Sequence, residues 1–157
     1  MLGTLIPIQI DKVLKEGLLG RIGCSADGKT YVVPISYAYD GKFIYCHTHE
    51  GLKTKIMREN PNICFEVEEM KDMANWNSVI VQGEFVELYK PAEINQAMEI
   101  LLKRYLPIIS SVTTHLGKHW PFHPDDATEI DGITFKIKIK EKYGRFESGE
   151  STSNTFG

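Results

Sequence analysis

Hydrophobic and polar residues alternate with a period of two along much of the chain, which is the pattern of half-buried β-strands. The segments with this pattern are 19–26, 31–39, 42–47, 63–68, 78–88 and 133–140. Asp27-Gly28 and Asp40-Gly41 separate the first three segments, and both dipeptides favour tight hairpin turns. The pattern therefore predicts six strands that are joined mostly by hairpins.

Three other segments have helical features. A helix over 12–16 is predicted with Asp11 as its cap, and a second over 52–60 ends where Pro61 follows. A third begins at Pro91 and ends before Pro107. Its apolar stripe has helical spacing and comprises Ile94, Ala97, Met98, Leu101 and Tyr105.

Strands and helices do not alternate regularly, so a doubly wound parallel sheet is not expected. Six antiparallel strands close most readily into a small barrel, which hides the sheet edges. The expected fold is mainly β, a six-stranded antiparallel barrel with helices, formed by one domain over residues 1–147. Residues 148–157 are rich in Gly, Ser and Thr and are predicted to be a disordered tail.

Composition narrows the class of protein. Of the 157 residues, 42% are hydrophobic and 25% are charged, which is typical of a globular protein. The net charge of −3 argues against nucleic acid or a membrane surface as the partner. No apolar run approaches the ~18 residues of a membrane span, and the N-terminus lacks signal-peptide features. We therefore expect a cytoplasmic protein with reduced Cys24, Cys46 and Cys64.

Residues 23–30 match the phosphate-loop pattern G-x-x-x-x-G-K-S/T. That loop works only when a helix follows it, because the amides of the helix N-terminus bind the phosphates. Here Thr30 is followed by strand-forming residues and Pro34, so we interpret the match as a hairpin turn.

Pro34 lies within the segment with the strongest strand character. A central strand does not tolerate the loss of a backbone donor, so Pro34 predicts an edge strand or a bulge. A second interpretation is that the barrel is interrupted here, which leaves backbone groups of Val33, Ile35 and Ser36 free for a ligand.

Residues 47–53 connect the third strand to a helix and could bind an anion. Helix N-terminal amides attract anions, Gly51 permits close approach to the backbone, and Lys53 adds a positive charge. A phosphate monoester fits this combination. The alternative is an ordinary capped helix with a solvated lysine.

Histidines offer a weaker metal alternative. His47 and His49 share one side of a strand, and His115, His119 and His123 recur every four residues. Pro121 and Pro124 interrupt the second group, so no metal site is predicted. The irregular segment 108–128 also contains Trp120, and its aromatic rings could stack on a planar ligand or pack against the barrel.

Several segments together resemble the FMN-binding split-barrel family, over about residues 18–140. They are the YVVPISY and DGKFIYCHT strands, the G-x-K helix start at Gly51, the R-x-N-P helix end at Arg58 and the SVIVQGE strand. Within that family, the sequence is most similar to the pyridoxamine-phosphate-oxidase-related flavoproteins that include nitroimidazole reductases.

The resemblance implies a homodimer with FMN at the subunit interface. Backbone groups of the YVVPISY strand would contact the isoalloxazine and ribityl chain, and residues around the G-x-K helix start would meet the phosphate. The SVIVQGE strand and the residues before it would reach the flavin from the partner subunit. The implied FMN-binding residues are Val33, Pro34, Ile35, Ser36, His47, Thr48, Lys53, Trp76, Ser78 and Val79. His47 is also the implied candidate for proton transfer to the substrate.

The resemblance also implies the function. We expect an FMN-dependent oxidoreductase that takes electrons from NAD(P)H or another electron donor and reduces a small acceptor such as a nitroaromatic. Oxidation of pyridoxamine phosphate is not expected, because Tyr31 stands at the position of a family arginine and the arginine–histidine motif near the C-terminus is missing. The alternatives are a flavin-binding protein without turnover and a haem-handling split barrel, in which a histidine near the C-terminus would be an axial ligand.

Overall fold

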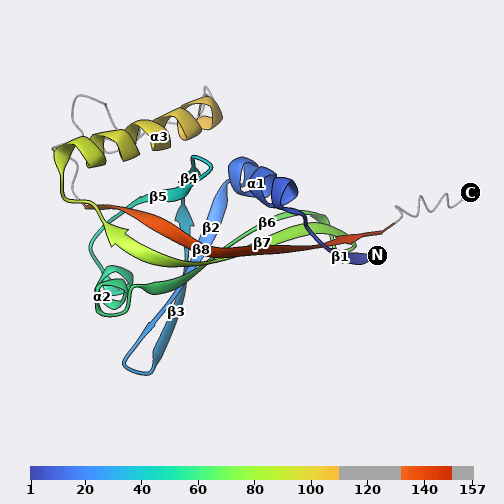
Figure 1. Cartoon of the computed structure of the whole chain (residues 1–157), viewed down its shortest axis with the longest axis horizontal. Coiled ribbons are helices and arrows are strands. Elements are labelled where there is room, and N and C mark those ends of the chain that lie inside the picture. Colours follow the sequence, from blue (N-terminus) through green and yellow to red (C-terminus); the bar gives the residue numbers. More distant parts are fainter. Residues whose placement is uncertain (110–131, 150–157) are drawn as a thin grey trace, which may run out of the picture.

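The structure is a computed structural model, and it describes residues 1–109 and 132–149 (Figure 1). These residues form eight strands and three helices. In chain order the elements are β1 (Leu2–Thr4), α1 (Pro7–Glu16), β2 (Leu19–Ala26), β3 (Lys29–Ser36), β4 (Ala38–Tyr39), β5 (Phe43–Thr48), α2 (Leu52–Glu59), β6 (Asn62–Asp72), β7 (Asn75–Glu87), α3 (Pro91–Ile109) and β8 (Ile133–Ser148).

The strands form one antiparallel sheet in the order β3-β2-β6-β7-β8-β5-β4, and β1 adds to β8. Among the described residues, no ladder joins the end strands β3 and β4, so the sheet curls without closing. The mainly β, split-barrel class is confirmed. The expected six strands were too few, because β1 was missed and Tyr37 divides the segment 31–39 into β3 and β4.

The concave side of the sheet holds the main core. Ile22, Phe65 and Val81 lie opposite one another across β2, β6 and β7, and all three are fully buried. The C-terminus of α1 reaches this core, where the hydroxyl of Tyr37 donates a hydrogen bond of 2.8 Å to the carbonyl of Leu14. Burial raises the pKa of Tyr37 far above its ordinary value, so the hydroxyl remains protonated.

A second core forms between α3 and the strands β4 and β5. It contains Ala38, Tyr45, Leu88, Ala97, Met98, Leu101 and Tyr105. Arg104 of α3 donates hydrogen bonds to the carbonyls of Glu16 and Gly17, so α3 also closes the C-terminal end of α1. In Figure 1, α2 and α3 lie at one end of the sheet, and β6, β7 and β8 extend away from them toward β1.

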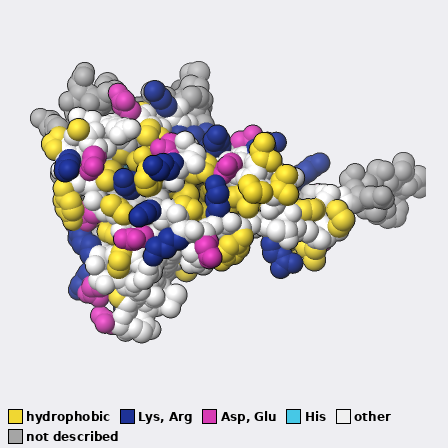
Figure 2. Space-filling view, in the orientation of Figure 1, with side chains coloured by type: hydrophobic (Ala, Val, Ile, Leu, Met, Phe, Trp, Pro, Cys, Tyr) yellow, Lys and Arg dark blue, Asp and Glu magenta, His cyan; other side chains and the backbone are white. Residues whose placement is uncertain are grey.

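The convex side of β3, β2, β6, β7 and β8 carries no helix among the described residues. Residues on this outer face fall into rows across the strands, such as Pro34–Arg21–Glu66–Ile80–Tyr143. All of them are half-buried or exposed. The rows on this face mix apolar and charged side chains. On the side of the molecule seen in Figure 2, side chains of both charge signs are likewise scattered among hydrophobic ones.

Two helix predictions were wrong at their ends. The first helix begins at Pro7, so Asp11 lies within it; the carboxylate of Asp11 accepts hydrogen bonds from Lys142 (2.6 Å) and Tyr39 (2.7 Å) instead of capping the helix. The third helix continues through Pro107 to Ile109. None of the three described helices combines the length and the apolarity needed to cross a bilayer.

The C-terminal segment differs from prediction at its first residue. Ser148 was assigned to a disordered tail, but it ends β8, and its amide donates a hydrogen bond of 2.9 Å to the carbonyl of Met1. The missed strand β1 explains this difference. It pairs with Arg145–Glu147, so the hydrogen-bonded part of β8 continues to the end of the strand. Residues 150–157 of the predicted tail lie outside the described residues.

Gly20 on β2 lies so close to the ring of Phe65 that no larger residue fits there. A Cβ at Gly20 would lie 2.2 Å from the ring of Phe65, which is fully buried. We expect Gly20→Ala to lower the free energy of unfolding by about 1–3 kcal/mol, the usual effect of overpacking. Urea denaturation measures this change.

Gly23→Ala on the same strand is the matched control. Its Cβ would meet Cys64 at 3.7 Å, an ordinary contact, so its stability should stay near that of the wild type. Equal stability of the two variants would contradict the assignment of Gly20 to a packed site.

Candidate functional site

The split in the barrel is the candidate site. β3 has no ladder partner on its outer edge among the described residues, and β5 pairs with β4 only through Ile44 and Tyr45. The edge of β5 from Cys46 to Thr48 is therefore open on the side of β3, with which β5 is in contact. An open strand edge presents backbone donors and acceptors that a ligand can use.

Side chains on β3 alternate across this edge. Ile35 faces the core and is buried, whereas Pro34 and Ser36 face outward and are exposed. The expectation of an edge strand at Pro34 is confirmed, and the strand ends two residues later. Since Thr30 lies within β3 and no helix follows it, the interpretation of residues 23–30 as a hairpin turn is also confirmed.

His47 and Thr48 at the end of β5 point to opposite faces. His47 shares the face of Tyr45, which packs under α3, and its Nδ1 lies 3.0 Å from the hydroxyl of Thr134 on β8. Thr48 instead shares the face of Cys46, which belongs to the main core. Gly132, in the left-handed region, lies against both residues; a Cβ there would come within 2.5 Å of the Thr48 carbonyl.

Lys53 carries a positive charge that no acidic group balances in the described part of the chain. It is half-buried in the first turn of α2, and no ion pair or hydrogen bond of its ammonium is found there. Burial raises the pKa of Cys24 and Cys46, and the nearby Lys53 partly opposes this shift. The positive charge of Lys53 therefore acts on two thiols of the main core, that of Cys24 on β2 and that of Cys46 on β5.

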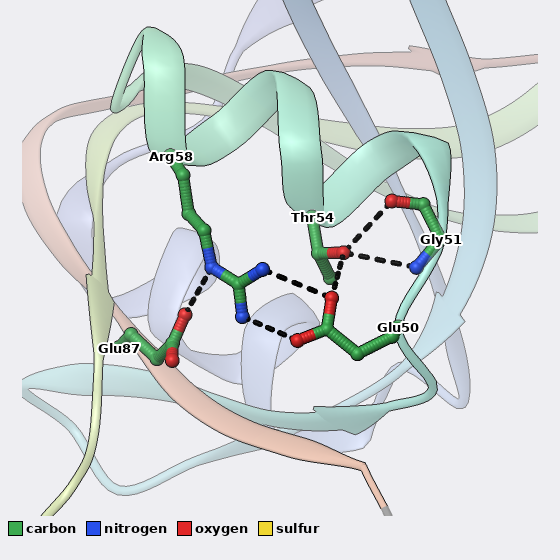
Figure 3. A network of polar contacts seen from close by, with 5 residues as sticks. All are labelled: Glu50, Gly51, Thr54, Arg58 and Glu87. Atoms are coloured by element: carbon green, nitrogen blue, oxygen red, sulfur yellow. Dashed lines mark hydrogen bonds and ion pairs between the residues drawn. The ribbon is translucent and has the colours of Figure 1, made fainter.

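The arginine of this helix, in contrast, has acidic partners. Arg58, one and a half turns along α2, donates two hydrogen bonds to the carboxylate of Glu50, at 2.6 and 2.9 Å, and a third of 2.7 Å to Glu87 (Figure 3). The bonds from Arg58 hold the pKa of Glu50 below its ordinary value. Glu50 is thus an ionised carboxylate in the link between Thr48 and Lys53.

Thr54 completes this network. Its buried hydroxyl accepts a hydrogen bond of 3.0 Å from the amide of Gly51 and lies 3.2 Å from the Glu50 carboxylate (Figure 3). The Glu50–Thr54–Arg58 network was not predicted from the sequence. Its signal is the four-residue spacing of these side chains, which places them on one helix face.

Trp76, Ser78 and Val79 on β7 are not brought to the split of their own chain. β7 lies three strands from β3, a distance of about 14 Å along the sheet. Trp76 and Ser78 are on the outer face, where they bond to Glu147 (2.9 Å) and Glu66 (3.1 Å). The side chain of Val79 is fully buried on the opposite face, so it can offer only backbone groups.

Metal ligands do not gather in the described residues. Among them, no three His, Cys, Asp or Glu side chains are grouped as a metal site requires. His115, His119, His123 and Trp120 lie outside the residues that the structure describes, as does most of the irregular segment 108–128.

An open antiparallel barrel with a cation beside the split defines the class of this chain as a split barrel. Over residues 8–145, it matches the family model described as pyridoxamine 5′-phosphate oxidase, and the chain belongs to that family. It is also 38% identical over 76 residues to an uncharacterised protein of Rhizobium meliloti. That alignment covers 48% of this chain and 50% of the relative, so it spans about half the length of each.

Solved structures resemble the chain over nearly its full length. A FAD-binding protein from Mesorhizobium loti is 27% identical, with a TM-score of 0.73, and the match covers 94% of this chain and 99% of that one. A candidate 5-nitroimidazole antibiotic resistance protein from Bacteroides thetaiotaomicron is 16% identical, with a TM-score of 0.70 over 93% and 89% of the two chains. At that identity the second likeness establishes the shared fold alone.

Proposed function

We propose that the protein is a flavin-dependent oxidoreductase that binds FMN at the split and reduces a small acceptor such as a nitroaromatic. The observation that carries this proposal is the half-buried Lys53, which no carboxylate neutralises in the described part of the chain. Membership of the pyridoxamine 5′-phosphate oxidase family and the likeness to a FAD-binding protein support a flavin as the ligand.

The residues at the split suit FMN. Lys53, the hydroxyl of Thr48 and the first amides of α2 would bind the phosphate, with open space at Gly51 for its approach. The edge of β3 at Val33, Pro34, Ile35 and Ser36 would lie along the isoalloxazine and ribityl chain. We favour FMN because its terminal phosphate monoester suits a helix N-terminus with an adjacent lysine.

Bound FMN would supply the transfer of a hydride or of electrons, and this chain would supply binding and polarity. A backbone donor in the Ile35–Ser36 segment would stabilise negative charge on the reduced ring. His47 is the proposed proton-transfer residue; its contact with Thr134 holds the ring in one orientation. We propose NAD(P)H as the electron donor. Tyr31 at a family arginine position argues against pyridoxamine phosphate as the substrate.

We also propose that two copies form each flavin site. Trp76 and Ser78 are about 14 Å along the sheet from β3 of their own chain, so a partner's β7 is the simpler source of these contacts. The outer face, with no helix over it among the described residues, is the surface that two chains would share.

The absorption spectrum and a redox titration test the function. We expect a yellow protein whose flavin bands bleach with NADH or NADPH under anaerobic conditions and return when a nitroaromatic is added. Bands that never bleach would favour a flavin-binding protein without turnover. A sharp Soret band would favour haem, and a protein that takes up no added flavin would overturn the proposal.

Lys53→Ala tests the phosphate assignment. We expect FMN binding to weaken by roughly 1.5–3 kcal/mol, the scale of a charge-assisted hydrogen bond, as measured by fluorescence titration. Lys55→Ala removes an exposed lysine from the same helix and should leave the affinity unchanged. Equal FMN affinity of both variants and the wild type would rule out Lys53 as a phosphate ligand.

Ile80→Glu tests the shared outer face. Ile80 is half-buried at the centre of that face, and a buried unpaired charge opposes association. We expect sedimentation to show a dimer for the wild type, a monomer for Ile80→Glu, and loss of flavin with the dimer. Ile8→Glu, on exposed α1 at the other side of the sheet, should stay dimeric. A monomeric wild type that retains flavin would refute the shared site.

A further inference from the structure

The carboxylate of Glu50 is placed where it could block an anion site. Glu50 directly precedes Gly51, and α2 begins one residue later. A carboxylate at this position is attracted by the free amides of a helix N-terminus and by any nearby cation. Lys53 is such a cation, and no acidic group neutralises it in the described part of the chain.

The structure instead holds Glu50 on the other face of the helix. Both carboxylate oxygens bind the guanidinium of Arg58, and Oε2 also lies 3.2 Å from the hydroxyl of Thr54. Thr54 and Arg58 are four residues apart, so they share one helix face, whereas Lys53 is turned about 100° from Thr54. Among the described residues, Glu50 forms its ion pair with Arg58 and not with Lys53.

Arg58 is itself fixed from a second side. Its Nε donates a hydrogen bond of 2.7 Å to Glu87 at the end of β7, and the side chain of Glu87 is only 11% exposed. The planar guanidinium can therefore bind Glu50 through one edge while the sheet orients it through the other. A flexible ammonium at this position would not reproduce both contacts.

We propose that Arg58 is a positioning residue that keeps the carboxylate of Glu50 away from Lys53 and so keeps the phosphate site open. This inference rests on the proposed binding of FMN at Lys53. It assigns Arg58 no contact with the flavin: without Arg58, the carboxylate turns to Lys53 and competes with the phosphate.

Paired titrations with FMN and riboflavin test this role, since riboflavin lacks the phosphate. We expect Arg58→Ala to weaken FMN binding about tenfold and to change riboflavin binding less than about twofold. Glu50→Gln in the Arg58→Ala background should return the FMN affinity to within about threefold of wild type, because the competing charge is gone. Arg58→Lys gives the same comparison if Arg58→Ala does not fold.

Glu59→Gln is the matched control, because it removes an exposed carboxylate from the same helix that has no ion pair in the described residues. It should leave both affinities unchanged. If Arg58→Ala weakens FMN and riboflavin equally, or if Glu50→Gln restores nothing, the role is refuted while FMN binding stands. A wild type that binds neither flavin, or both equally, would refute the phosphate site and this inference together.

Discussion

The main constraint on this structure is that, among the described residues, β3 and β5 form no hydrogen-bonded ladder, so the barrel stays open between them. Closing the barrel would satisfy the backbone groups of both edges, but Pro34 lacks a donor and β4 takes up only the first part of β5. Edges left open in this way need another partner, because unpaired strands otherwise associate with other chains. A bound ligand at the split would be such a partner, and the proposed site follows from this constraint.

The helices keep the unclosed sheet in shape. Tyr37, between β3 and β4, is bonded to α1 through its hydroxyl and to α3 through its carbonyl, which accepts a hydrogen bond from Tyr105. Arg104 joins the same two helices. Helix packing thus replaces the missing ladder, so the split can remain accessible without loss of the core.

Patterns of period two predicted most of the sheet, because a strand with one buried face has an apolar residue at every second position. Phe65 and Val67 alternate with glutamates, and β6 formed there. The three-residue β1 was too short to show a period, and pairing with β8 determines it. Asp11 was misassigned because the sequence does not reveal that Lys142, 131 residues away, is its partner.

For the site as well, features set by local sequence were predictable, and features set by contacts distant in sequence were not. The edge position of Pro34 and the placement of Lys53 at the start of α2 follow from local rules, and the structure has both. The face to which His47 turns depends on α3 and on Thr134, which local patterns do not reveal. The bond of Arg58 to Glu87 joins residues 29 positions apart, so only the fold discloses it.

Side chains along β7 alternate between two environments. Val79 and Val81 are fully buried, whereas Trp76, Ser78 and Ile80 look outward from the same strand. Mutations at the outward positions can therefore accumulate without loosening the interior. Descendants of one ancestral scaffold could diverge in what they recognise while inheriting an unchanged framework.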